Sequence, residues 1–314
     1  MRAQSYDRSD LARSLTQVLE PLGGMAAFVK PGDRVLLKPN LLTGSRPAKE
    51  CTTRPELVYA VAQQVQAAGG RPFLGDSPAF GSAYGVAKVN GLLPLAQALN
   101  LPIVELHGQR YPTDSPEFDH LRLSKEAMEA DVVINLPKVK SHVQLTLTLG
   151  VKNLFGCVPG KMKAWWHMEA GKDVQRFGTM LVETARLIAP ELTIVDGIVG
   201  HEGNGPSGGE PRDLGVLGAS DDVFAIDRAL VAVLGIDPLT VPTVAQSLRL
   251  HACPAWDNIT FPLLTPDELR VTDWQLPSEL MPIDFGMPRV VQSTFKHLYI
   301  RFIKEPMTAY AGRL

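Results

Sequence analysis

The first 240 residues alternate short apolar runs with longer amphipathic stretches, and this alternation constrains the fold more than any other feature of the chain. Runs typical of β-strands occupy 34–38, 71–74, 102–106, 131–136, 192–195 and 215–219. Helical patterns occupy 55–68, 86–99, 124–128, 174–188 and 222–234. Strands separated by helices form βαβ units, so the sequence predicts an α/β fold with a mostly parallel sheet and flanking helices.

The remaining residues, 241–314, follow no such alternation and carry seven prolines between 242 and 288. Proline removes a backbone donor and interrupts regular structure. We therefore expect residues 1–240 to form the α/β body, with room for two lobes, and residues 241–314 to form an irregular extension packed on it.

Composition limits the class of protein. The 314 residues are 45% hydrophobic and 20% charged, which is an ordinary globular balance, and the net charge is −2. We expect no nucleic acid and no membrane among the partners, because nothing in the overall charge attracts either. The start of the chain lacks an apolar signal core, and no apolar run approaches the roughly 20 residues that span a bilayer. A cytoplasmic location is predicted; the sequence predicts no oligomeric state.

Polar side chains follow several predicted strands at the point where each strand ends. They are Lys38 with Asn40, Asp76 with Ser77, Asn135 with Lys138 and Lys140, and Asp196 with Glu202 and Asn204. Ligands of open α/β sheets bind at the carboxyl ends of the strands, which predicts a small-molecule site here. The alternative is that these residues are polar only because loops are polar.

Residues 132–168 contain five lysines and no Asp or Glu: Lys138, Lys140, Lys152, Lys161 and Lys163. Such a segment needs an anionic partner, and phosphate or carboxylate is the natural ligand, unless the segment is a solvated basic face. His142 is the expected proton-transfer group, because its charge changes near neutral pH. Lys152 could instead be a nucleophile if its neighbours lower its pKa, and Asp76 is a reserve acid–base group.

Metal and cluster chemistry are weaker alternatives. Asp196 and Glu202 could bind a divalent cation beside the glycine-dense stretch 197–209, which is neither a P-loop nor a dinucleotide fingerprint and is expected to form a lid or ligand wall. Cys51 and Cys157 could hold an iron–sulfur cluster with help from a partner subunit, although packing cysteines are commoner. The three cysteines form no CxxC pair.

Several ordered motifs resemble the family known as domain of unknown function 362. They include 35–40, 53–58, 75–78, 134–142, 150–160 and 196–206, over roughly residues 30 to 240. A fainter similarity is to the lactate racemase group. There Thr53-Arg54-Pro55 resembles a triplet whose arginine binds substrate carboxylate, and His142 and Lys152 stand at the offset of a histidine and of the lysine that bears a nickel-pincer nucleotide. The chain departs from that pattern at Asp76-Ser77, where the group has a second catalytic histidine, and at Cys51, where it has an aspartate.

Three functions follow as hypotheses. The first is a redox or isomerase-type enzyme with a His/Lys site that binds an anionic small molecule or a phosphate-bearing, nucleotide-like cofactor. The second is an iron–sulfur or electron-transfer protein with a protein redox partner, and the third is a non-catalytic cofactor binder or maturation factor. The residues expected to bind the anion or cofactor are Lys38, Asn40, Arg54, Lys138, Lys140, Asn153, Lys161, Lys163 and Asn204.

Overall fold

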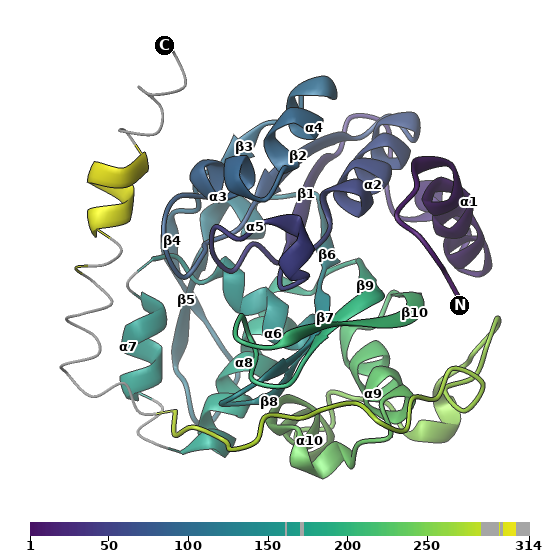
Figure 1. Cartoon of the computed structure of the whole chain (residues 1–314). Helices are drawn as coiled ribbons and strands as arrows, with labels where there is room; N and C mark the ends of the chain where they lie inside the picture. The colour runs from purple at the N-terminus through teal and green to yellow at the C-terminus, as the bar shows by residue number, and fades with distance from the viewer. Residues whose placement is uncertain (161, 170–172, 284–294, 296–297, 306–314) are drawn as a thin grey trace.

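The computed structural model describes residues 1–160, 162–169, 173–283, 295 and 298–305. One mixed sheet runs through the molecule in the order β3-β2-β1-β6-β9-β7-β8, with β10 paired to β9 (Figure 1). Its parallel strands are β1 (Arg34–Pro39), β2 (Arg71–Gly75), β3 (Ile103–Val104), β6 (Val132–Leu136), β7 (Lys138–His142) and β9 (Leu192–Glu202). Two strands are antiparallel to their neighbours, β8 (Thr146–Thr148) and β10 (Glu210–Ser220). The predicted α/β class is confirmed.

Helices cover both faces of the sheet. Val35 and Leu37 of β1 lie in one apolar cluster with α1 (Arg8–Leu19), α2 (Pro55–Ala67), α3 (Ala83–Val89) and α4 (Leu92–Ala98). Leu36, between them, lies in a second cluster with α6 (Gly150–Leu154) and α8 (Val174–Ile188). Successive side chains of a strand point to opposite faces, so one buried strand supports both layers.

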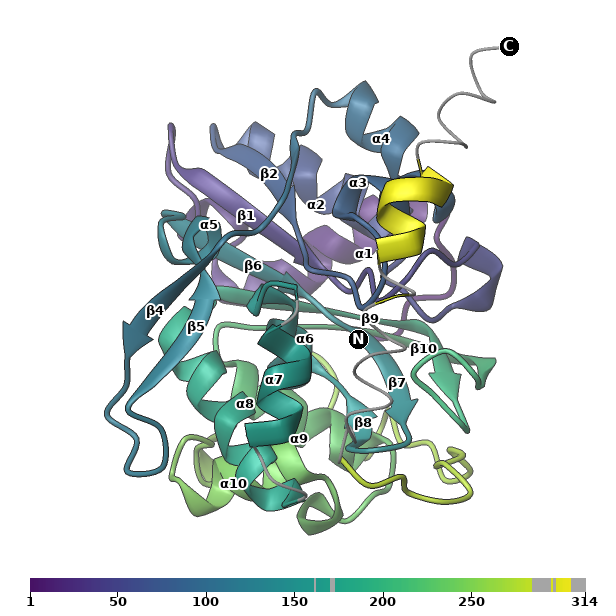
Figure 2. The same ribbon diagram turned by 90° about the vertical axis from the view of Figure 1, so that its left-hand side faces the viewer.

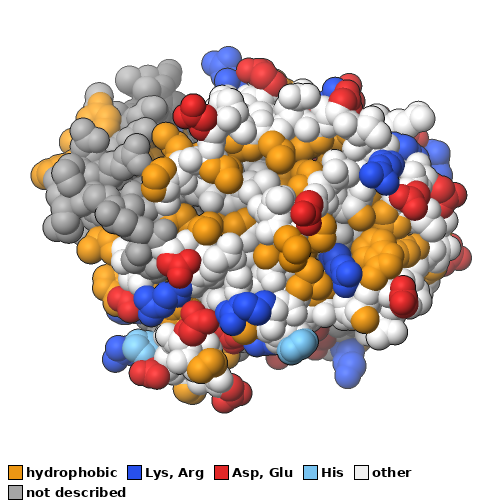
Figure 3. Space-filling view, turned by 90° about the horizontal axis from the view of Figure 1, so that it is seen from below, with side chains coloured by type: hydrophobic (Ala, Val, Ile, Leu, Met, Phe, Trp, Pro, Cys, Tyr) orange, Lys and Arg blue, Asp and Glu red, His pale blue; other side chains and the backbone are white. Residues whose placement is uncertain are grey.

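The remaining helices are α5 (Lys125–Met128), α7 (Met162–Glu169), α9 (Val223–Val233) and α10 (Pro242–Arg249). A separate hairpin, β4 (Gly108–Pro112) with β5 (His120–Ser124), projects from the body, as Figure 2 shows at the left. Figure 3 shows positive and negative side chains interspersed on the lower face of the molecule. None of the helices in the described part of the chain is long and apolar enough to cross a membrane.

Two predicted elements need correction. The single helix expected at 86–99 is two helices, because Gly91 adopts the left-handed region (φ 81°) and turns the chain between α3 and α4. The glycine-dense stretch 197–209 is only partly a loop: 197–202 belong to β9, which pairs with β10 as a long antiparallel ribbon. Only the turn at 203–209 remains, and only Pro206 of that turn lines the pocket described below.

The described part of the proline-rich extension contacts the body at β7. Trp274 Nε1 donates a hydrogen bond to Ser141 Oγ at 3.0 Å, and Ser141 Oγ donates to the backbone oxygen of Gln275 at 2.8 Å. Residues 284–294, 296–297 and 306–314 of that extension lie outside the described residues. The extension therefore supports the strand that carries Lys140 and His142.

Candidate anion-binding pocket

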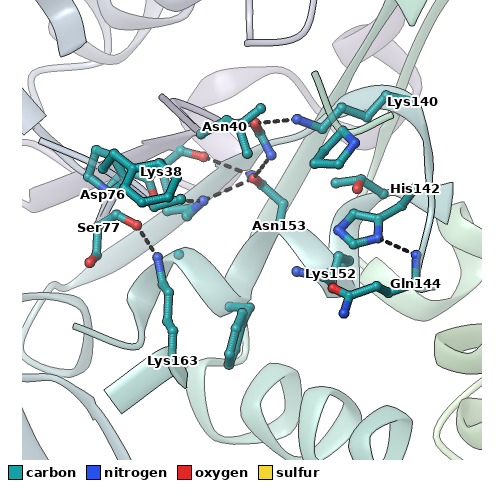
Figure 4. Close-up of a pocket in the computed structure, with 18 of the residues that line it drawn as sticks. Lys38, Asn40, Asp76, Ser77, Lys140, His142, Gln144, Lys152, Asn153 and Lys163 are labelled. Carbon is teal, nitrogen blue, oxygen red and sulfur yellow. Dashed lines mark hydrogen bonds and ion pairs between the residues drawn. The ribbon is translucent and has the colours of Figure 1, made fainter. Parts of the chain in front are cut away.

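A cavity of about 380 Å³ opens at the carboxyl ends of the central strands (Figure 4). β1 contributes Lys38, β7 contributes Lys140 and His142, and α6 contributes Lys152 and Asn153. Asp76 and Ser77 follow β2, and Lys163 and His167 come from α7. The lining thus brings together residues up to 168 positions apart (38 to 206), at the carboxyl ends of the strands, as the strand-end rule predicts.

The side-chain amide of Asn153 is the centre of a hydrogen-bond network at the base of the pocket. Its Oδ1 accepts hydrogen bonds from Lys38 Nζ and from Asn40 Nδ2, both at 2.9 Å. Its Nδ2 donates to Asn135 Oδ1 at 2.9 Å and to the backbone oxygen of Lys38 at 3.2 Å. Because every donor and acceptor of this buried amide is paired, the ends of β1 and β6 and the helix α6 are held in one register.

Lys38 and Asp76 form a buried ion pair beside this network. Lys38 Nζ lies 3.1 Å from Asp76 Oδ1, and the two side chains are only 1% and 3% exposed. Asp76 Oδ2 also accepts the backbone N–H of Leu41 at 2.9 Å. Gly156 lies directly against the pair, where a Cβ atom would come within 2.0 Å of Asp76 Oδ1 and 2.4 Å of Lys38 Nζ. Asp76 thus contacts Lys38 directly, and among the described residues of the lining this one carboxylate stands against four lysines.

Among the described residues, the hydrogen-bond acceptors of the Lys140 ammonium group are neutral oxygens. Its Nζ donates to Asn40 Oδ1 at 2.9 Å and to the backbone oxygen of Cys51 at 2.7 Å. Burial lowers the pKa of Lys140 to about 7, and the neighbouring Lys38 and Lys138 act in the same direction. A buried ammonium held by amide and carbonyl oxygens readily loses its proton or gains an anion.

Lys152 and Lys163 face the same cavity from two helices. Lys152 Nζ lies 4.8 Å from the centre of the Phe155 ring, and no carboxylate or hydrogen-bond acceptor pairs with it among the described residues. Lys163 Nζ donates a hydrogen bond to the backbone oxygen of Ser77. Burial lowers the pKa of Lys152 to about 7, and Lys163, Lys140 and Lys38 lower it further. Burial also lowers the pKa of Lys163 to about 8, where Asp76 opposes the shift and Lys38 adds to it.

His142 is held in one tautomer by its own turn. The backbone N–H of Gln144 donates to His142 Nδ1 at 3.1 Å, so a neutral ring carries its proton on Nε2. Burial lowers the pKa of His142 well below its ordinary value, and Lys152, Lys140 and His167 add to this effect. His167 stacks on Phe177 with ring centres 4.5 Å apart, and its pKa is lowered to about 3 by burial first and by Lys152 second. Both histidines are neutral at neutral pH.

The placement of α6 depends on an aspartate that sequence analysis did not single out. Asp227 of α9 accepts the backbone N–H groups of Gly150 and Val151 at 2.6 and 2.9 Å, at the first turn of α6. A Cβ at Gly150 would lie 2.8 Å from Asp227 Oδ1, so only glycine allows this approach. Burial raises the pKa of Asp227 to about 7 despite these two donors. The two hydrogen bonds from Gly150 and Val151 to Asp227 therefore fix the position of α6, which carries Lys152 and Asn153.

Lys138 and Arg54 do not join the pocket. Lys138 Nζ lies 2.7 Å from Glu50 Oε2 and 3.2 Å from Asp196 Oδ2, with all three side chains buried. Arg54 Nε pairs with Glu50 Oε1 at 2.9 Å, and its guanidinium lies 4.6 Å from the Tyr6 ring centre. Two cations face two carboxylates in this second cluster, so it is neutral as a whole. The anion-binding role expected for Lys138 and Arg54 is corrected accordingly: their charges are used inside the fold.

The residues expected to bind metal are also committed elsewhere. Asp196 accepts hydrogen bonds from Tyr6 OH, Lys138 and the backbone N–H of Arg54, and Glu202 accepts the backbone N–H of Gln275 at 3.0 Å. Asn204 is exposed and accepts from the Ser278 backbone N–H at 3.2 Å, outside the pocket. Lys161 lies outside the described residues.

Cys51 and Cys157 are both buried free thiols. Cys157 belongs to an apolar cluster, and burial raises its pKa to about 12, which opposes the thiolate that a cluster ligand must supply. In the described residues no group of three or more His, Cys, Asp and Glu side chains is placed to hold a metal ion. The geometry thus favours the lysine pocket over the metal and iron–sulfur alternatives.

Some pocket residues carry no signal that sequence analysis could use. Gln144, Thr148, Phe155 and Gly156 line the cavity, and Glu50 neutralises Lys138 from a left-handed turn (φ 50°). Glu50 lies in a polar segment with no strand before it, so nothing in the sequence marks it as buried. Gly156 lies inside a motif that the family resemblance already contains, and that resemblance was the only route to it.

One similar protein is the thylakoid-associated protein sll1697 from Synechocystis sp. (strain ATCC 27184 / PCC 6803 / Kazusa). It is 67% identical over 313 residues, which is 100% of this chain and 98% of the relative. Among solved structures, the lactate racemase apoprotein from Thermoanaerobacterium thermosaccharolyticum aligns with a TM-score of 0.45 at 12% identity, over 73% of this chain and 56% of its own. A protein from Thermotoga maritima aligns with a TM-score of 0.41 at 10% identity, over 64% and 53%. The chain spans little more than half the length of each solved structure.

The resemblance to a family of unknown function is confirmed by a family model. The model described as domain of unknown function (DUF362) matches residues 35–232, which include β1 through most of α9 and all the pocket lysines. That match covers well over half of the chain, and the chain therefore belongs to the DUF362 family.

Proposed function

We propose that the protein binds a small molecule carrying a phosphate or carboxylate group in the lysine pocket and transfers a proton on it. One observation carries the proposal: Lys140, Lys152 and Lys163 surround one cavity, and among the described residues of its lining the one carboxylate, Asp76, is paired to Lys38. Cations buried without counter-ions are costly, and a bound anion removes that cost. A cavity of about 380 Å³ suits a metabolite-sized ligand.

The proton chemistry is best divided between Lys152 and His142. Lys140 and Lys163 would hold the anionic group of the substrate, and Lys152, whose pKa is about 7 in the anion-free pocket, would act in its neutral form, which has a free lone pair. His142 keeps its proton on Nε2 and acts as a neutral hydrogen-bond donor toward an oxygen of the ligand. We therefore assign the base to Lys152 and the donor to His142, which reverses the roles expected from sequence. Removal of a proton from a carbon next to a carboxylate or carbonyl is the reaction class that this pair serves, as in an isomerase.

A phosphate-bearing cofactor would use the same cations. Lys140, Lys152 and Lys163 would hold its phosphate oxygens, and such a cofactor would supply electron-accepting chemistry for a redox reaction. The uncompensated charge of the three lysines fits this group as well as it fits a substrate. A non-catalytic binder would show the same binding and no turnover.

The location of the protein belongs to the same proposal. The name of the Synechocystis relative places that relative at thylakoids. We propose that this chain works on the cytoplasmic side of such a membrane, at its surface, which is compatible with the cytoplasmic location expected from sequence.

Sulfate binding followed by calorimetry tests the pocket without knowledge of the ligand. Lys152→Met should weaken sulfate binding by roughly 10- to 100-fold, because a charge-assisted contact is worth about 1.5–3 kcal/mol. Lys125→Met is the matched control, since Lys125 is half exposed and its pair with Glu129 spans 3.6 Å on the surface. Equal affinities in Lys152→Met and wild type would contradict the proposal.

The affinity for sulfate should fall as the pH rises. Lys140 and Lys152 have pKa values of about 7 and Lys163 of about 8 in the anion-free pocket, so all three are charged below these values and lose their protons above them. Since sulfate keeps its charge throughout, the affinity should drop at least about tenfold from about pH 6 to about pH 9. Calorimetry in buffers of different ionisation enthalpy should also show proton uptake on binding near pH 7.5 (about 0.5 or more protons). A flat pH profile would show that the lysines stay charged without an anion.

A further inference from the structure

The described residues of the C-terminal segment present an exposed aromatic surface. Phe295 is 70% exposed, Tyr299 56%, Phe302 66% and Ile303 48%. We call these four residues the aromatic surface. Large apolar side chains normally lie inside a fold, and a group of them on one short segment marks an interaction site.

The segment is attached to the body by its other side. Glu305 accepts hydrogen bonds from the backbone N–H and the hydroxyl of Ser82 at 2.9 and 2.8 Å. Ile300 Cγ2 lies close to Gly81, 3.4 Å from where a Cβ would stand. The body therefore takes up Ile300 and Glu305, while the aromatic surface stays in solvent.

This surface lies on the same side of the molecule as α7. The yellow C-terminal segment and α7 are both at the left in Figure 1 and both face the viewer in Figure 2. α7 adds two further exposed apolar side chains, Trp165 and Met168, each 42% exposed. Phe80, two residues before Ser82, lines the lysine pocket, as does Lys163 of α7. The pocket is thus bordered by the segments that carry exposed apolar side chains.

The charge of the segment identifies its partner. Residues 285–304 contain Arg289, Lys296, Arg301 and Lys304 and no Asp or Glu, in a protein whose net charge is −2. Sequences that combine aromatic and aliphatic side chains with Lys and Arg are typical of segments that lie in the interface of an anionic bilayer. The overall charge, from which no membrane partner was expected, conceals this local excess.

We propose that the C-terminal segment docks the protein onto the surface of an anionic lipid bilayer, with the aromatic surface inserted among the headgroups and acyl chains. The inference deepens the membrane-surface location proposed above and is independent of what the lysine pocket binds. A second copy of this chain is the competing occupant, and it would be held by the aromatic residues without a requirement for anionic lipid.

Co-sedimentation of the full chain with vesicles tests the proposal. Wild type should bind vesicles of phosphatidylglycerol and phosphatidylcholine (about 1:1) at least tenfold more tightly than vesicles of phosphatidylcholine alone, since each basic residue at an anionic surface contributes about fivefold. The double variant Phe295→Ser/Phe302→Ser should bind at least tenfold more weakly than wild type. Lys296→Gln/Arg301→Gln/Lys304→Gln should lose the preference for phosphatidylglycerol.

Leu239→Ser is the matched control, because Leu239 is 67% exposed, like Phe302, but lies elsewhere on the surface. It should bind as wild type does. The proposal is overturned if wild type ignores both kinds of vesicle, if the serine double variant binds unchanged, or if light scattering shows a dimer that the double variant abolishes without any lipid binding. Sulfate affinity should be unchanged in every one of these variants, which separates failure here from failure of the pocket.

Discussion

Replacing Lys138 by methionine should lower the free energy of unfolding by about 3–5 kcal/mol. Lys138 is fully buried and is the shared partner of Glu50 and Asp196, at 2.7 and 3.2 Å. Without it, two carboxylates face only Arg54, and one buried negative charge has no counter-ion. Chemical denaturation followed by circular dichroism measures the loss, with Lys125→Met as a surface control expected within about 0.5 kcal/mol of wild type.

The double variant Lys138→Met/Asp196→Asn should recover part of that loss, because it removes one cation and one carboxylate together and leaves the pair of Arg54 with Glu50 in place. Sulfate affinity of folded Lys138→Met should stay within about threefold of wild type, since Lys138 does not line the pocket. A loss of stability no larger than that of Lys125→Met would show that the buried network contributes little. A collapse of sulfate binding in the folded variant would return Lys138 to the binding site.

Gly156→Ala should destabilise the protein by about 2–3 kcal/mol and weaken sulfate binding at least tenfold. The new methyl group would meet Asp76 Oδ1 at 2.0 Å and Lys38 Nζ at 2.4 Å. These two groups are side-chain ends, but they cannot move aside, because Lys38 also bonds Asn153 and Asp76 also bonds Leu41 N. The floor of the pocket must therefore shift. Thermal unfolding and calorimetry measure the two effects.

The backbone does not contribute to this effect, since Gly156 is not among the glycines with positive φ. Gly44→Ala is the control: Gly44 also lacks a positive φ, and its new methyl would meet only the Val89 side chain at an ordinary 3.5 Å. Gly44→Ala should leave both stability and binding nearly unchanged. If the two variants behave alike, the close approach of Gly156 to the ion pair does not organise the pocket.

Much of the architecture could be predicted from the sequence because it depends on local patterns. The helix expected at 174–188 is α8 with the same bounds, and the strands at 34–38, 71–74 and 131–136 each lie within one residue of β1, β2 and β6. Apolar periodicity reports burial along one element, and that information is local. The break between α3 and α4 was not predicted, because the apolar pattern continues across it and only the left-handed conformation of Gly91 interrupts the helix.

The candidate site was likewise predicted in part from the sequence. The order of strands and polar residues was sufficient to predict that Lys38, Asn40, Asp76 and Lys140 gather at one edge, because parallel strands end together. The sequence left open whether His142 and Lys152 share one pocket, and the structure has both in the lining of the same cavity. Lys138 and Lys140 are two residues apart in one strand, and sequence alone assigns them to the same face and the same task. The pairing of β7 with β9 shifts its register between them, so that Lys138 stands opposite Asp196 and Lys140 opposite His201.

Tertiary structure alone therefore decided which lysines form ion pairs with carboxylates and which do not. Glu50 and Asp196 come from distant parts of the chain and neutralise Lys138 in the interior, while no carboxylate of the described residues forms an ion pair with Lys140 or Lys152. The sequence by itself determined most of the parallel strands, several of the helices and the edge of the sheet, because these follow from periodicity and strand direction, whereas β7 was not predicted. The counter-ions of each lysine depend on long-range contacts and on one irregular strand pairing, and no local pattern encodes those.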